Sequence, residues 1–100
     1  MKTFNDLTFI PHPNSEEGLS AWLEFDNGRG ISVITGSSHF LSSEEEPYEV
    51  GFLQKDGDLG HIYSQDKGEI ELLEGENGND VAGYCTPEQV TLIMKAIQKL

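Results

Sequence analysis

The sequence predicts a single α+β domain, in which an antiparallel β-meander of about four to five strands carries one C-terminal α-helix on one face. Two observations predict this fold. Alternating apolar and polar residues flank a tight-turn sequence at residues 26–30, and residues 86–100 combine a helix-start signal with an apolar stripe. The chain of 100 residues shows no repeat and no linker, so we expect one domain over residues 1–100.

The first half of the chain carries the clearest strand signals. Residues 7–10 are apolar and are followed by two prolines, which predicts an edge strand or a tucked arm. Residues 19–25 and 31–35 both alternate, and the Asp-Asn-Gly-Arg-Gly turn between them favours a tight antiparallel hairpin. Residues 48–54 predict a third core strand, which ends at the Lys-Asp-Gly-Asp turn of residues 55–58.

The remaining segments are shorter and more polar. Residues 36–47 are loop-like, with a short strand at residues 39–41 as an option. Apolar residues at 62–63 and 70–73 predict two further short strands, and a polar stretch follows at residues 74–80.

The last element is an amphipathic helix. Thr86 is the expected N-cap, with Pro87 at the first helical position and Gln89 at the third, as a capping box requires. Five apolar residues then recur at three- and four-residue spacing: Val90, Ile93, Met94, Ile97 and Leu100. This stripe needs an apolar partner, so we expect the helix to pack on the sheet.

Acidic residues dominate the composition. Eighteen Asp and Glu oppose six Lys and Arg, which gives a net charge of −12. No basic residue occurs between Arg29 and Lys55, and the nine acidic residues from Asp56 to Met94 meet one base, Lys67. Such a field repels nucleic acid and anionic membranes and attracts basic protein surfaces. The alternative interpretation is that the charge only keeps a small protein soluble.

The chain also carries signals about its compartment. Cys85 is the only cysteine, so no intramolecular disulfide is possible, and a reducing compartment fits best. No apolar run approaches the length of a membrane span. Residues 1–13 have no apolar segment typical of a signal peptide. We therefore expect a cytoplasmic protein that is not bound to a membrane.

Nucleophilic and zinc chemistry are weakly supported. Cys85 precedes the helix N-cap, and a helix N-terminus lowers a thiol pKa, but no neighbouring base is evident. His12, His39 and His61 are widely separated and form no ligand pair with metal-site spacing. We expect a packed, unreactive Cys85, loop histidines and no metal site.

Calcium, phosphate and nucleic-acid motifs are also incomplete. The Asp56–Gly60 segment begins like a calcium loop, but Gly60 and Lys67 occupy positions that need oxygen ligands. Gly28-Arg29-Gly30 lacks the rest of a dinucleotide fingerprint. Six basic residues give little support for phosphate contacts, so direct nucleic-acid binding is not expected. No cofactor is predicted.

The abundant carboxylates do not indicate a hydrolase. A carboxylate acid–base pair needs one buried member in a cleft, whereas these acids cluster in polar, turn-rich segments. We therefore predict that the protein is not an enzyme.

Trp22 is the remaining candidate. It occupies the phase of its strand opposite to Leu23 and Phe25, so it points outward if those residues point into the core. An exposed Trp beside acids is typical of a protein-binding hot spot. The alternative is that the helix or the N-terminal arm covers the second face of the sheet and buries Trp22.

Four stretches of the chain resemble a family of small phage and prophage proteins of unknown function. They are M-K-T-F-x-D-L-x-F at residues 1–9, L-x-F-D-N-G-x-G-I-S-V-I-x-G at 23–36, Y-E-V-x-F-L at 48–53, and D-V-x-G-Y-x-T-P-E-Q-V-x-x-I-M-K-x-I-Q-x-L at 80–100. The resemblance implies a small protein of a bacterial host's cytoplasm that binds host machinery stoichiometrically, including CRISPR effectors or restriction enzymes. The segment from Ser37 to Pro47 departs from the pattern, so it is the expected contact loop.

These observations lead to two hypotheses. The first is a non-enzymatic, phage-encoded inhibitor, anti-CRISPR-like, whose acids bind a basic host protein such as a nucleic-acid-binding effector complex. The second is a phage structural or assembly protein that oligomerises through a sheet edge, so the chain is a monomer or a small homo-oligomer. The partner-binding residues predicted for the inhibitor are Glu44, Glu45, Glu46, Glu49, Asp56, Asp58, Glu74, Glu76, Asp80 and Trp22.

Overall fold

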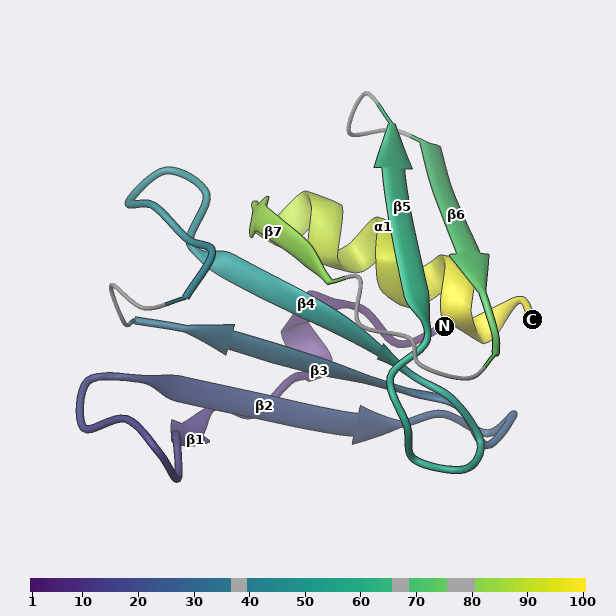
Figure 1. Ribbon diagram of the computed structural model, residues 1–100, viewed down its shortest axis with the longest axis horizontal. Coiled ribbons are helices and arrows are strands. Elements are labelled where there is room, and N and C mark those ends of the chain that lie inside the picture. Colours follow the sequence, from purple (N-terminus) through teal and green to yellow (C-terminus); the bar gives the residue numbers. More distant parts are fainter. Residues whose placement is uncertain (37–39, 66–68, 76–80) are drawn as a thin grey trace.

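The computed structural model describes residues 1–36, 40–65, 69–75 and 81–100 (Figure 1). Its elements are η1 (Phe4–Asp6), β1 (Ile10–Pro11), β2 (Leu19–Glu24), β3 (Gly30–Thr35), β4 (Tyr48–Leu53), β5 (His61–Gln65), β6 (Glu69–Leu73), β7 (Ala82–Cys85) and α1 (Pro87–Gln98). Within this part of the chain, no helix is long and apolar enough to cross a membrane.

The strands form one antiparallel sheet and a separate hairpin. The sheet has five strands in the order β1-β2-β3-β4-β7, and β5 pairs with β6. Helix α1 packs against β3, β4, β7 and β6, and Figure 1 shows it behind the sheet. The predicted α+β fold with one C-terminal helix on a face of an antiparallel sheet is therefore confirmed.

The hairpin of β2 and β3 follows the predicted turn. The Phe25 amide donates to the Arg29 carbonyl at 2.7 Å, and Gly28 has a φ of +83°, which an Asn-Gly sequence accommodates at little steric cost. The side chain of Asn27 donates to the Ile97 carbonyl at 2.8 Å, which ties the turn to the C-terminal end of α1. The turn therefore fixes both the strand register and one end of the helix.

Helix α1 begins as predicted. The Thr86 hydroxyl accepts the Gln89 amide at 3.2 Å, and the Thr86 amide donates to the Gln89 side chain at 2.8 Å. The helix ends at Gln98, so Leu100 lies beyond it and is exposed, and its predicted place on the stripe was wrong. The other four residues of the stripe are buried in the hydrophobic core that the helix shares with the strands. The strand residues that are fully buried in this core are Ile31, Val33, Val50 and Phe52.

Three segments differ from the sequence predictions. The edge strand is Ile10–Pro11, whereas Leu7 and Phe9 pack on the core as an arm. Phe40 and Leu41 lie in a bend and not in a strand, and His39 is outside the described residues. Strand β7 was not predicted, because it contains a glycine and a residue in left-handed conformation and it pairs with the distant β4.

Candidate functional site

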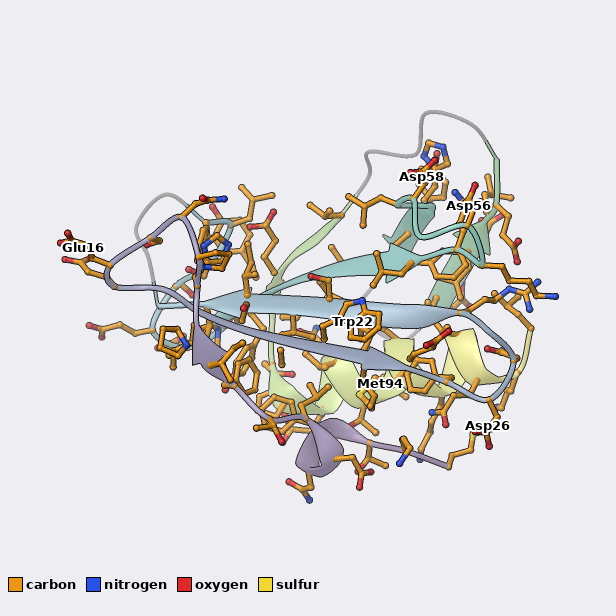
Figure 2. All side chains as sticks on the ribbon, turned by 90° about the horizontal axis from the view of Figure 1, so that it is seen from below. Glu16, Trp22, Asp26, Asp56, Asp58 and Met94 are labelled. Carbon is orange, nitrogen blue, oxygen red and sulfur yellow. The ribbon has the colours of Figure 1, made fainter. Side chains whose placement is uncertain are left out.

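Side chains on the central strands alternate between the two faces of the sheet. On the face away from the core, Trp22 of β2 lies opposite Ser32 of β3, which in turn lies opposite Gly51 of β4. These small neighbours leave the Trp22 side chain 64% exposed. Figure 2 shows Trp22 and Met94 on opposite sides of the sheet, so neither the helix nor the N-terminal arm covers the indole.

A shallow hollow lies beside Trp22 on this open face. Its volume is about 190 Å³, and its lining comes from β2, β4 and the turns that follow them: Trp22, Glu24, Gly28, Gly30, Leu53, Gln54, Lys55 and Gly57. Strands β2 and β4 are both antiparallel to β3, so their following turns meet at the same end of the sheet.

The side chain of Gln54 fixes one wall of the hollow. It is 92% buried, since its exposed fraction is 8%. Its amide nitrogen donates to the carbonyls of Leu59 at 3.2 Å and Gly75 at 2.9 Å, and its oxygen accepts the Gly75 amide at 2.8 Å. The two bonds to Gly75 join the turn after β4 to the chain after β6, and the bond to Leu59 closes the turn itself, so this wall is held from two sides.

Carboxylates outnumber cations around the hollow. Glu24 lies in its lining, and Asp56 and Asp58 belong to the turn after β4; all three are exposed. Figure 2 shows Asp56 and Asp58 on the same side of the sheet as Trp22. The basic residue in the lining is Lys55. The lining itself therefore carries one carboxylate and one ammonium group, and the two further carboxylates belong to the adjoining turn.

Arg29 contributes little free charge at this end of the sheet. Its side chain is only 15% exposed, and its Nε donates to the Glu74 carboxylate in a salt bridge. Glu74 was predicted as a partner-binding residue, but its carboxylate is engaged by Arg29 within the molecule.

The other predicted acids lie at the opposite end of β4. Glu44 and Glu45 are exposed in the loop before the strand, and Glu46 is half-buried there. Glu49 is half-buried, and its carboxylate accepts the Leu41 amide at 3.1 Å. Most of β4, which rises about 3.3 Å per residue, lies between this group and the turn that carries Asp56 and Asp58. The structure therefore divides the predicted acids into two groups.

Two predicted partner-binding acids and the lone thiol remain to be placed. Glu76 and Asp80 lie outside the described residues. Cys85 is buried, with its Sγ 3.6 Å from the carbonyls of Ala82 and Gly83, as expected for a packed thiol. Among residues 1–36, 40–65, 69–75 and 81–100, no three potential ligands of the His, Cys, Asp and Glu types are grouped to hold a metal ion.

The remaining described histidines pack against aromatic rings. The ring of His12 lies 5.1 Å from that of Phe40, and its Nδ1 accepts the Asn14 amide at 3.1 Å. The ring of His61 stacks on Tyr63 at 5.9 Å. These contacts give both side chains a structural role.

The sequence predicted Trp22, Asp56 and Asp58 as contact residues but did not reveal the hollow, whose lining includes Trp22 and two residues, Lys55 and Gly57, of the turn that carries both acids. The signal was present in the two glycine-containing turns, which follow alternate strands of a meander and so lie at one end of the sheet. The resulting surface combines an exposed indole, the Glu24 carboxylate and the Lys55 ammonium group around a shallow hollow. No protein-family model matches this chain, and comparisons with curated proteins and with solved structures found no match.

Proposed function

We propose that this protein is a non-enzymatic binding protein whose open sheet face, around Trp22, takes up a basic surface of a partner protein. The observation that carries the proposal is the indole of Trp22, which is 64% exposed beside a hollow whose lining includes Glu24. A Trp side chain offers roughly 150–250 Å² of contact area, most of which this fold leaves in water. Trp is one of the residue types enriched among the energetic hot spots of protein interfaces.

Charge supports the choice of a basic partner. Three exposed carboxylates lie on the same side of the sheet as the indole: that of Glu24 in the hollow itself, and those of Asp56 and Asp58 in the turn after β4. A Lys or Arg side chain above the ring would gain both a cation–π contact and an ion pair. The net charge of −12 would also steer a basic partner towards the molecule over longer distances.

The resemblance to small phage proteins supports a narrower version of this proposal. In this version the protein inhibits a host defence complex in the bacterial cytoplasm by occupying a basic channel made for nucleic acid. The exposed Glu44 and Glu45, at the far end of β4, would then form a second contact. Because these two carboxylates and the hollow lie at opposite ends of β4, a target that contacts both must present a basic surface longer than the hollow.

The proposal is tested by capture from a bacterial lysate on immobilised protein. We expect Trp22→Ala, and separately the triple charge reversal of Glu24, Asp56 and Asp58 to Lys, to weaken retention of the partner by about tenfold or more at low salt. The matched control is Leu92→Ala, which truncates an exposed apolar side chain on α1. Equal retention by wild type and both site variants would contradict the proposal.

The second hypothesis, assembly through a sheet edge, also has an observation in its favour. Strand β1 pairs only with Leu19 and Ser20, which leaves the rest of the outer edge of β2 without a neighbouring strand in the described chain. An oligomer that persists at high salt in sizing chromatography would favour assembly. A monomer at all concentrations would favour the binding protein.

A further inference from the structure

The outer edge of β2 is only half covered. Ile10 pairs with Ser20 and Pro11 with Leu19, and the His12 amide donates to the Gly18 carbonyl at 2.8 Å. Beyond Ser20 no strand of the described chain pairs with this edge, and Figure 1 shows β1 beside one end of β2 only. Trp22 lies on the uncovered part, so the exposed indole and the open edge are adjacent.

The hydrogen-bonding pattern of the β2–β3 hairpin shows which backbone groups of β2 are not bonded to β3. The Phe25 amide bonds to Arg29 of the partner strand, and Phe25 and Arg29 continue the register of β2 and β3. In an antiparallel pair the residues that bond across the ladder alternate, so Leu23 and Ala21 also bond to β3. The amides and carbonyls of Trp22 and Glu24 therefore point away from β3, towards the open edge.

Resting on the proposed function, we infer that the partner contributes an extended segment that adds to the edge of β2 as an antiparallel strand. Such strand addition takes its affinity from main-chain hydrogen bonds and its specificity from alternate side chains. Two free amides and two free carbonyls, those of Trp22 and Glu24, are the groups that this segment would bond. The inference thus identifies how the basic partner is held.

The chemistry of the edge specifies the segment. A residue paired with Trp22 presents its side chain on the open face, where the indole and the Glu24 carboxylate favour Lys or Arg. The next residue points to the other face, beside Leu23, which is half-buried and packs on the core. The segment is therefore one in which basic and apolar residues alternate, with the basic residues opposite Trp22 and Glu24.

A second copy of the chain is the weaker occupant. Pairing two β2 edges would bring together two molecules that each carry a net charge of −12, and it would place additional carboxylates beside Glu24. A basic segment gains from the same field. The charge therefore selects a foreign cationic strand over self-association.

The test uses a synthetic peptide, acetyl-TKVKVKVT-amide, and two N-methylated versions. Residues of an extended peptide that pair with Trp22 and Glu24 direct their amides to β2, and the intervening residues direct theirs to solvent. Methylation of the three lysine amides removes the donors that face β2, whereas methylation of the three valine amides is the matched control. Trp22 is the only Trp of the chain, so its fluorescence reports binding at the edge directly.

We expect the parent and the valine-methylated peptides to bind within about threefold of each other, and the lysine-methylated peptide to bind about tenfold or more weakly. Equal binding of the two methylated peptides, a reversed order, or no binding of the parent would overturn the inference. So would a dimer of the free protein that dissociates when the parent peptide is added. Peptide binding that ignores methylation but is lost in Trp22→Ala would leave the proposed binding face intact and remove only the strand addition.

Discussion

Trp22 is exposed because of its position within β2 and because its neighbours are small. Ser32 and Gly51 lie across from it and supply no side chain large enough to shield an indole. The buried residues of the same strands point to the other face, so exposing Trp22 removes nothing from the core. The indole is therefore available to a partner under the proposed function.

The first prediction at this scale separates binding from stability. Because the Trp22 side chain is 64% exposed, Trp22→Ala should change the free energy of unfolding by less than about 1 kcal/mol. Urea denaturation followed by far-UV circular dichroism measures this change. A loss of several kcal/mol would show that the indole supports the fold, and the binding results for this variant would then need a structural explanation.

Gly60 provides a second prediction. A Cβ at this position would lie 2.6 Å from the ring of Phe52 and 2.9 Å from the Leu73 carbonyl, so Gly60→Ala should destabilise the fold by about 3 kcal/mol. Gly57 is the control, because it has a φ of +89° and open space around its Cβ position, and its replacement by Ala should cost only about 1 kcal/mol of backbone strain. Equal losses in urea denaturation would contradict the close packing of β4 beneath Gly60.

Helix α1 depends on its first residues as well as on its buried stripe. The reciprocal bonds of Thr86 and Gln89 satisfy amides that no helical carbonyl can reach. Thr86→Ala should lower the free energy of unfolding by about 1 kcal/mol, whereas Thr86→Ser retains the hydroxyl and should lose much less. Thermal and urea denaturation compare the two variants, and equal losses would argue against the hydroxyl as the cause.

The elements divide into those that local signals specify and those that they do not. The hairpin turn at residues 26–30 and the capping box at Thr86 were predictable, because each depends on a few adjacent residues. Strand β7 was not, because its four residues gain their conformation from pairing with β4 and from the Tyr84 amide, which donates to the distant Leu41 carbonyl at 2.8 Å.

The candidate site likewise combines features that local sequence predicts with features that depend on how distant segments pack. The outward phase of Trp22 could be read from the alternation of its strand, but its exposure depended on where distant segments pack. The hollow arises from two turns that lie 29 residues apart, at Gly28 and Gly57, and the register of β2, β3 and β4 brings them together. The strand predicted at residues 48–54 already lies between the two groups of acids, whereas the engagement of Glu74 by Arg29 depends on distant packing.

Across the whole molecule, the acidic charge is carried by a compact body. The radius of gyration is 12.4 Å, close to the roughly 13 Å expected for a folded chain of this length. A net charge of −12 on such a body extends its attraction to basic surfaces by about one Debye length, roughly 8 Å at physiological salt. Under the proposed function, the whole molecule would steer a basic partner, and Trp22 and its surroundings would select the contact surface.

The central claim is that the open face around Trp22, and not the acidic surface in general, receives the basic partner. It is tested most directly by titrating ¹⁵N-labelled protein with the lysine–valine peptide and following the amide and indole resonances. The account predicts the largest shifts at Trp22, Glu24 and residues 54–58. Shifts centred on residues 44–49 or on α1, with the Trp22 indole unmoved, would contradict it.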